Sequence, residues 1–269
     1  MRNLSVKQIY THSPLRNYTY LVYSERSGEA ICIDPYSAEQ IVNFLKKNSL
    51  SLKRILNTHE HKDHVAGNLE LKEATKAQIF AHPKTVGLVP GLDEVLKEGD
   101  VAFEAEGESL KALETPGHTF CHLCYVMGDA TGSKEIFTGD TLFHGGVGNC
   151  YRGGDPKTLF QTLNSKILSL PDHIKINPGH DYIENNLKFS LTLEPENDLL
   201  KEMQEWVSHH HNEASPFEAT LGKEKKINPF FRLREIFNDC PDFFQSMGTE
   251  IPKTEENLFI YLRSVRDKW

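Results

Sequence analysis

Long hydrophobic runs are missing from this sequence of 269 residues. Its longest apolar runs have about five residues, whereas a transmembrane helix needs about 20 in succession. The N-terminal segment MRNLSVKQIYTHS also lacks the apolar stretch and the small-residue cleavage site of a secretory signal. We therefore expect neither membrane insertion nor export, and we predict a cytoplasmic location.

Cysteine and positive charge are also in short supply. An odd number of cysteines, scattered along the chain, favours reduced thiols over a disulfide framework. They are Cys32, Cys121, Cys124, Cys150 and Cys240. The C-x-x-C spacing of residues 121 and 124 stands alone at a predicted strand start, and we interpret it as packing. A formal net charge of −8 argues against binding to a nucleic-acid backbone.

The sequence does contain a regular alternation of short strand-like runs and amphipathic helical segments up to residue 182. The runs predict strands over residues 18–23, 29–34, 53–57, 78–82, 109–114, 122–127, 134–139 and 173–177. Helices are predicted after the capping residue Ser37, over 67–77 and after the pair Asp155-Pro156. Residues 83–108 are expected to form loops because they are rich in Gly, Asp and Glu.

From Ile183 onward the pattern becomes helical. Helices are predicted over residues 183–193, 196–211, 232–239 and 255–266. The three histidines at 209–211 are expected to form a solvated helix end. We predict a mixed α/β domain over residues 1–182, followed by an all-α domain over residues 183–269.

Histidines are concentrated in the stretch RILNTHEHKDHVAG, residues 54–67. In an extended turn, residues two apart point the same way, so His59 and His61 can bind one metal ion. Asp63 and His64 follow where the chain bends into a helix, so they point elsewhere. One small tetrahedral ion does not comfortably take all four ligands from one loop. The stretch therefore predicts two adjacent ions that share a bridging carboxylate.

Further strand-like runs also end in a residue that can bind a metal. These residues are His118 after TPG, Asp140 after EIFTG and His180 after PG. Strand ends at one edge of a sheet are where α/β proteins gather their chemistry, so we expect these groups to converge. Imidazole and carboxylate ligands together suit zinc, manganese or iron. A single histidine at a strand end is usually only a polar cap, but that interpretation does not account for the whole set.

These motifs resemble the metallo-β-lactamase fold superfamily, whose signature is H-x-H-x-D-H followed by a distant His, Asp and His. More narrowly, the sequence is similar to the glyoxalase II, or hydroxyacylglutathione hydrolase, family. The matching segments are NYTYL (17–21), THEHKDHVAGN (58–68), TPGHT (115–119), FTGDTLF (137–143), PGHDY (178–182), NNLKF (185–189), NPFFR (228–232) and LRSVRDKW (262–269). The resemblance implies an α/β fold, a four-layer αββα sandwich, with a C-terminal all-α domain that binds substrate.

The resemblance also implies the ligand sets and the reaction. The first ion would be held by His59, His61 and His118, and the second by Asp63, His64 and His180, with Asp140 bridging. Asp63 and Asp140 are the expected catalytic residues, and the two divalent ions are expected to be zinc, with iron or manganese as alternatives. A hydroxide shared by two cations forms near neutral pH. It would attack the thioester of an S-D-lactoylglutathione-type substrate and release a 2-hydroxy acid and a thiol.

Substrate contacts are implied between the two domains. Tyr151 and Tyr182 match aromatic contacts of the family, and Arg263 and Arg266 match its basic C-terminal motif. Arginine can bind a carboxylate with two hydrogen bonds. The segment HGGVGNCYRGG (144–154) departs from the family form G-C-G-[KR]-[FY]-[FY]-E-G at residues 147, 149, 150 and 152. Asn149 replaces a basic residue that would contact the thiol carrier, so the carrier is either glutathione or another thiol. Arg152 is the candidate to supply the missing positive charge from a neighbouring position.

Other functions are compatible with parts of this sequence. A mononuclear iron persulfide dioxygenase and a hydrolase of lactones or β-lactams share the fold, but the helical C-terminal segment disfavours both. A metal-binding scaffold without catalysis is disfavoured because every expected ligand is present. The segment NPFFR is interpreted as a turn that packs the helices on the first domain, with Arg232 as a docking candidate. We expect a monomer with a small-molecule thioester substrate and no nucleic-acid or membrane partner.

Overall fold

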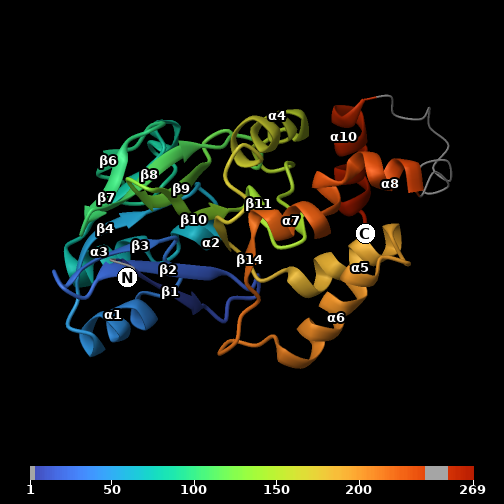
Figure 1. Ribbon diagram of the computed structural model, residues 1–269. Coiled ribbons are helices and arrows are strands. Elements are labelled where there is room, and N and C mark those ends of the chain that lie inside the picture. Colours follow the sequence, from blue (N-terminus) through green and yellow to red (C-terminus); the bar gives the residue numbers. More distant parts are fainter. Residues whose placement is uncertain (1–3, 240–253) are drawn as a thin grey trace.

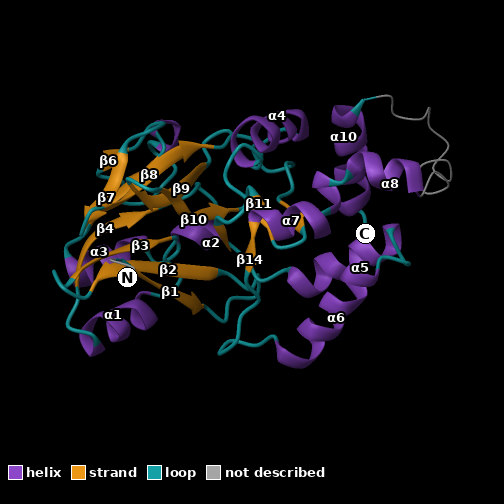
Figure 2. Cartoon of the chain, viewed as in Figure 1, coloured by secondary structure: helices purple, strands orange, loops and turns teal. Residues whose placement is uncertain are grey.

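The computed structural model describes residues 4–239 and 254–269. Within them, the strands form two six-stranded sheets and one two-stranded sheet, and Figures 1 and 2 show the strands gathered beside a group of C-terminal helices. The first sheet has the order β1-β2-β3-β4-β5-β6. Its strands are β1 (Ser5–Tyr10), β2 (Tyr18–Ser24), β3 (Glu29–Ile33), β4 (Ser51–Leu56), β5 (Gln78–Ala81) and β6 (Glu94–Val95).

The second sheet has the order β14-β13-β10-β9-β8-β7. Its strands are β7 (Val101–Ala105), β8 (Glu108–Glu114), β9 (Leu123–Asp129), β10 (Gly132–Gly139), β13 (Lys175–Pro178) and β14 (Ala219–Thr220). Strands β10 and β13 run parallel, so their carboxyl ends lie at the same edge of the sheet. The short hairpin of β11 (Leu142–Phe143) and β12 (Gly146–Val147) follows β10 directly.

Some helices cover the outer faces of the two sheets, and the others form the C-terminal group or short connections. In chain order they are α1 (Ala38–Lys47), α2 (Lys62–Val65), α3 (Asn68–Thr75), η1 (Pro83–Thr85), α4 (Pro156–Thr162), η2 (Leu163–Ile167), α5 (Ile183–Leu193), α6 (Asp198–His210), α7 (Leu221–Ile227), η3 (Pro229–Phe231), α8 (Leu233–Asp239) and α10 (Glu255–Arg266). Ser37 caps α1 and Asp155 caps α4 through their side chains, which confirms both predicted helix starts.

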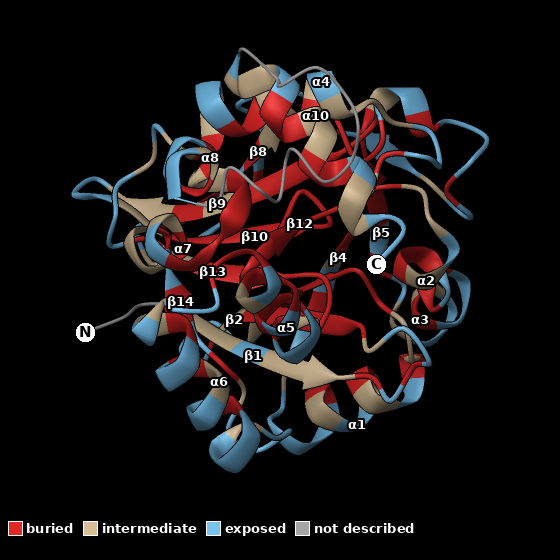
Figure 3. Ribbon diagram, turned by 90° about the vertical axis from the view of Figure 1, so that its right-hand side faces the viewer, coloured by how far each residue is buried: buried red, intermediate tan, exposed pale blue. Residues whose placement is uncertain are grey.

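Strand alternation explains the layers. On β3, Ile31 and Ile33 face the second sheet, where they pack with Tyr125 and Phe137. Their neighbours Ala30 and Cys32 face the opposite way, toward α1 and α3. Successive side chains of a strand point to opposite faces, so one strand serves two cores. The result is the predicted helix–sheet–sheet–helix order, and Figure 3 shows the buried residues concentrated in the sheets between the helices.

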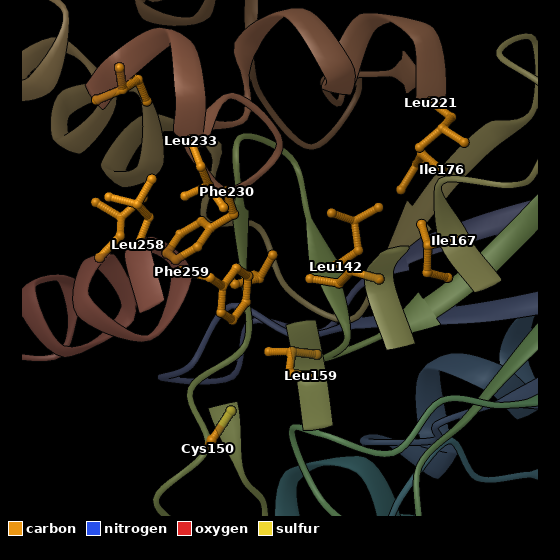
Figure 4. Packing of buried hydrophobic residues seen from close by; sticks show 14 of the residues in the cluster. Leu142, Cys150, Leu159, Ile167, Ile176, Leu221, Phe230, Leu233, Leu258 and Phe259 are labelled. Carbon is orange, nitrogen blue, oxygen red and sulfur yellow. The ribbon is translucent and has the colours of Figure 1, made fainter. Parts of the chain in front are cut away.

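A third core joins the outer face of the second sheet to the C-terminal helices. Ile136 and Ile176 of this sheet belong to one buried cluster with Phe230 and Phe259. Figure 4 shows these two phenylalanines close together, with a ring-centroid distance of 5.3 Å. The NPFFR segment therefore packs the helices on the first domain as predicted. The prediction that Arg232 docks the helices on the first domain was wrong, because Arg232 pairs with Glu194 of the helical region at 2.6 Å.

The expectation that residues 83–108 form only loops was wrong. This region contains η1, β6 and β7, and β7 lies at the edge of the second sheet. An edge strand needs fewer apolar residues than a central one, so its sequence, VAFEA, reads as weakly β-like. The short elements β1, β14 and α7 were also missed, since two- to seven-residue elements give little periodicity.

The described cysteines, residues 32, 121, 124 and 150, are buried and free, while Cys240 lies outside the described residues. Cys124 packs in the third core, in agreement with the packing interpretation. In the described part of the chain, no helix combines the length and apolar character needed to cross a bilayer. His209 and His210 are exposed as expected. His211 is only partly exposed, and its side chain pairs with Asp181 at 2.8 Å, so the expectation of a solvated triplet was wrong for His211.

Candidate metal centre

The seven predicted ligands meet where strands of the two sheets end. His59, His61, Asp63 and His64 come from the loop and helix α2 after β4, and His118 comes from the turn after β8. Asp140 and His180 follow the parallel strands β10 and β13. The two sheets are joined beside this point, because the amide of Tyr18 donates to the carbonyl of Gly179 at 2.8 Å.

A first cluster is formed by three imidazoles. Nδ1 of His61 lies 3.0 Å from Nε2 of His59 and 3.0 Å from Nε2 of His118. Ring nitrogens this close repel one another unless a proton or a cation lies between them. Nitrogen ligands about 2.1 Å from one tetrahedral ion lie roughly 3.4 Å apart, so the observed spacing is close to that of a shared cation.

A second cluster is formed beside the first. Nε2 of His64 lies 3.1 Å from Nε2 of His180. Oδ2 of Asp63 lies 3.3 Å from the first of these nitrogens and 3.4 Å from the second. A carboxylate with two imidazoles is a donor set that suits a divalent transition metal.

Asp140 lies between the clusters and faces both. Its Oδ2 is 3.4 Å from Nε2 of His118, and its Oδ1 is 3.3 Å from Nε2 of both His64 and His180. Among the described residues, Oδ1 is a buried oxygen without a hydrogen-bond partner. A buried, unpartnered carboxylate oxygen is costly unless a cation satisfies it. The residues present therefore fit two metal ions with a shared carboxylate.

Burial and repulsion from neighbouring imidazoles keep two rings of the first cluster neutral. Burial lowers the pKa of His59 well below its usual value and that of His118 to about 4, so both rings are unprotonated at pH 7. Burial alone would raise the pKa of Asp140, but His180, His64 and His118 hold it well below its usual range. Neutral imidazole and ionised carboxylate are the forms that bind a metal.

The ring nitrogens that face away from the clusters are also held by partners. The pairs are His59 Nδ1 with Thr58 Oγ1 (2.9 Å), His61 Nε2 with the Arg152 carbonyl (3.0 Å), His64 Nδ1 with Asp34 Oδ2 (2.9 Å), His118 Nδ1 with the Asn149 carbonyl (2.6 Å) and His180 Nδ1 with the Leu15 carbonyl (2.7 Å). Since a carbonyl or carboxylate oxygen can only accept, the imidazole donates to it and presents its other nitrogen to the cluster. Such partners orient metal ligands.

Sequence reasoning missed two buried groups here. Asp34 accepts hydrogen bonds from the amide and hydroxyl of Thr58 and from His64. His122 stacks on His59 with a centroid distance of 5.0 Å, and its Nε2 accepts from the amide of Asp140. Asp34 ends the run EAICID, so the same strand-end pattern that indicated the other ligands could have indicated Asp34. His122 begins a strand, and no local signal marked it.

A cavity of about 220 Å³ adjoins the second cluster. It is lined by Phe143, Val147, Asn149, Tyr151, Tyr182, Asn186, Arg263, Arg266 and Asp267. All five side chains expected to contact substrate are thus brought together here. The ring of Tyr182 stacks on His180 with a centroid distance of 4.7 Å, which joins the cavity to the candidate metal site.

The cations of this cavity differ in their surroundings. Arg263 is buried, pairs with Asp267 at 2.9 Å and donates to the carbonyl of Val147 at 2.8 Å. Arg266 donates to the amide oxygen of Asn186 at 3.3 Å and lies over the ring of Trp269. The charge of Arg263 is therefore balanced within the protein, whereas these contacts leave the charge of Arg266 available to a ligand.

Family comparisons agree with this geometry. Residues 13–180 match the metallo-beta-lactamase superfamily, and residues 181–269 match the hydroxyacylglutathione hydrolase C-terminus. The chain belongs to the hydroxyacylglutathione hydrolase family. Relatives with that name include one from Nitrosococcus oceani, 40% identical, and one from a Polaromonas species, 38% identical; each match covers 98% of this chain and 99% of the relative.

Solved structures share the fold of this family member. The crystal structure of ETHE1 from Myxococcus xanthus matches with a TM-score of 0.64 at 23% identity, over 97% of this chain and 99% of that one. The crystal structure of TTHA1623, in a di-iron-bound form, matches with a TM-score of 0.58 at 27% identity, over 83% of this chain and 99% of that one. The predicted metallo-β-lactamase fold with a C-terminal helical region is confirmed.

Proposed function

We propose that this chain is a binuclear metal-dependent thioesterase that hydrolyses S-D-lactoylglutathione and similar 2-hydroxyacyl thioesters. Water adds across the C–S bond, so the acyl carbon gains the hydroxyl group and the sulfur leaves as the free thiol. The observation that carries the proposal is Asp140, whose two oxygens face the two histidine clusters. The family match over residues 181–269 and the hydrolase names of the relatives support the reaction.

The residues that would hold the cations are those of the two clusters. His59, His61 and His118 would bind the first, Asp63, His64 and His180 the second, and Asp140 both. Bound divalent cations supply Lewis-acid activation of water and of a substrate carbonyl. Zinc is the proposed metal, and iron or manganese would accept the same ligands.

Asp63 and Asp140 are the proposed catalytic residues because they are the two carboxylates among the clustered ligands. Asn17 donates from Nδ2 to Oδ2 of Asp63 at 2.8 Å, which fixes that carboxylate toward the second cluster. The backbone amide of Asp140 donates to His122, which fixes the turn that carries the shared carboxylate. Both carboxylates are thereby held in place before substrate arrives.

The cavity beside Tyr182 would receive the thiol carrier. We propose that Tyr151, Tyr182 and Asn149 contact its peptide-like part and that Arg266 binds its acidic end. Arg263 would support this wall, since its own charge is paired with Asp267. With Asn149 in place of a basic residue, glutathione would be bound with one cation fewer than the family form provides.

We further propose that residues 1–182 form the catalytic domain, that residues 183–269 supply substrate contacts, and that the chain acts as a monomer in the cytoplasm. A relative from Arabidopsis thaliana, 30% identical over 94% of this chain, is named a cytoplasmic hydroxyacylglutathione hydrolase, which supports the location. Light scattering, which measures the molar mass of the purified protein in solution, tests whether it is a monomer.

The experiment that tests the function is thiol release from a panel of thioesters by protein whose metal content has been measured. The panel contains S-D-lactoylglutathione, other acyl-glutathiones, acyl-coenzyme A and acyl-bacillithiol. We expect turnover of the lactoyl thioester in samples with about two ions per chain. Two bound ions without release of any thiol would refute the proposal and leave a metal-binding scaffold.

A further inference from the structure

One loop connects the candidate metal site to the C-terminal helices. Residues 144–152, here called the connecting loop, begin after β11, include the short strand β12 and pass beside the first histidine cluster. Its Asn149 carbonyl accepts a hydrogen bond from Nδ1 of His118 at 2.6 Å, and its Arg152 carbonyl accepts one from Nε2 of His61 at 3.0 Å. The loop therefore orients two imidazoles of the first cluster through its main chain.

The same loop is held from its other side by the C-terminal helices. Buried side chains of the helices bond to it: Asn186 to the His144 carbonyl (2.9 Å), Glu224 to the Gly145 amide (2.9 Å), Asn228 to the Gly146 carbonyl (3.1 Å) and Arg263 to the Val147 carbonyl (2.8 Å). Each of these side chains is less than a tenth exposed, so water does not easily replace the bonds. The position of the loop thus depends on the helices.

Glu224 of α7 makes the most demanding of these contacts. Its side chain is 0% exposed, and its carboxylate accepts from Nδ1 of His144 at 2.8 Å as well as from the amide of Gly145. A fully buried carboxylate is stable only while its hydrogen bonds are satisfied. Removal of Glu224 would therefore leave a buried amide and a buried imidazole without their acceptor.

Two glycines of the loop pack directly against its neighbours, although Val147, Asn149 and Tyr151 face the cavity. A Cβ atom on Gly148 would lie 2.0 Å from the carbonyl oxygen of Asp140 and 2.8 Å from Nδ1 of His118. A Cβ atom on Gly146 would lie 2.7 Å from Nδ2 of Asn186. Because Gly146 packs against the helix side and Gly148 against the ligand side, a shift at the helix end of the loop should be transmitted to the ligand end.

The second cluster is oriented independently of this loop. Asp34, at the end of β3, holds His64, and the carbonyl of Leu15, before β2, holds His180. Both partners lie next to strands of the first sheet and not in the connecting loop. A perturbation of the connecting loop should therefore affect the first cluster more than the second, which the loop reaches only through the backbone of Asp140.

We infer that Glu224 is a positioning residue which, through the connecting loop, sets the cation affinity of the cluster formed by His59, His61 and His118. This inference rests on the metal site proposed above. Loss of an outer partner of a metal ligand typically weakens metal binding by about 10- to 100-fold. Glu224 acts one step further out, through the loop, so removal of its carboxylate is expected to weaken the binding of one of the two ions by about tenfold, the low end of that range.

The test is a zinc titration of metal-free full-length protein against a chromophoric chelator, which resolves two dissociation constants. In Glu224→Ala we expect one constant to rise about tenfold and the other to stay within about twofold. Glu224→Gln should restore most of the affinity, since its amide oxygen can accept from Gly145 and His144 can change tautomer. The matched control is Glu202→Ala, an exposed position on α6.

Ligand-deleted backgrounds assign the effect to a cluster. The Glu224→Ala effect should persist in His180→Ala protein and vanish in His118→Ala protein. If Glu224→Ala does not fold, Gly146→Ala displaces the loop from the Asn186 side and should give the same selective loss. If both zinc dissociation constants of Glu224→Ala stay unchanged, or if both rise equally, the inference about Glu224 is overturned while the proposed metal site stands. Wild-type protein that binds fewer than two zinc ions would overturn the metal site as well.

Discussion

Replacement of Asp140 by asparagine removes a carboxylate that faces both clusters. The two oxygens of Asp140 lie 3.3–3.4 Å from ligand nitrogens on opposite sides. Asparagine keeps the shape, but its NH₂ group is a donor and cannot bind a cation. One of the two clusters therefore loses its shared ligand, and the number of bound ions should fall from about two to about one.

The size of the effect follows from linkage between metal binding and folding. At a free-metal concentration about 100 times the dissociation constant, one bound ion stabilises the folded state by about 2.7 kcal/mol. In a chain of this length, 1 kcal/mol shifts the midpoint of thermal unfolding by about 2–4 °C, so one ion raises it by about 5–11 °C. Asp140→Asn should lose one of two such increments, together with most thioesterase activity.

The assay compares the thermal midpoints of metal-loaded and chelator-treated samples of each variant, with metal counted in parallel. Taking the difference within one variant cancels any change in the metal-free fold. The control is Asp198→Asn, whose carboxylate is 90% exposed on α6. Full retention of two ions and of the metal-dependent rise in Asp140→Asn would show that this carboxylate is not shared.

Further predictions concern the cavity and the core. Arg266→Ala should raise KM for S-D-lactoylglutathione about tenfold or more with kcat retained, because one charge-assisted hydrogen bond is lost; steady-state kinetics check it, and an unchanged KM contradicts it. Asn149→Lys should lower KM for glutathione thioesters, and no change would point to another thiol carrier. Phe259→Ala, at a 0% exposed position, should lower the unfolding free energy by about 3–5 kcal/mol in urea, whereas the 48% exposed Phe120 should tolerate alanine.

The sequence predicts those elements of the fold whose own residues form a clear local pattern. Central strands such as β3 and β9 carry enough apolar residues to be recognised, and Ser37 and Asp155 mark helix starts. Edge strands such as β7 are stabilised by a neighbour rather than by their own composition, so their sequences give a weak signal. Their presence depends on tertiary pairing that no short window contains.

The site divides in a similar way. His59, His61, Asp63 and His64 lie in one loop, so spacing alone divides them into two pairs. His118, Asp140 and His180 could be expected from strand ends, but their grouping came from family resemblance until the structure gave distances. His122 is recognised only in three dimensions, because it acts by stacking on His59 and accepting from the amide of Asp140.

The connecting loop differs from the family form in its side chains but keeps the main-chain contacts that orient the metal ligands. The positions at which it departs from the family form include Val147, Asn149 and Arg152, which suggests a changed site. Yet the contacts that these residues make to Arg263, His118 and His61 come from their main-chain carbonyls, which every amino acid has. Gly146 and Gly148, which the family form keeps, lie where a Cβ atom would collide with Asn186 or Asp140. The ligand-orienting role of the loop is thus compatible with these side-chain changes, and the changes alter only what the cavity can bind.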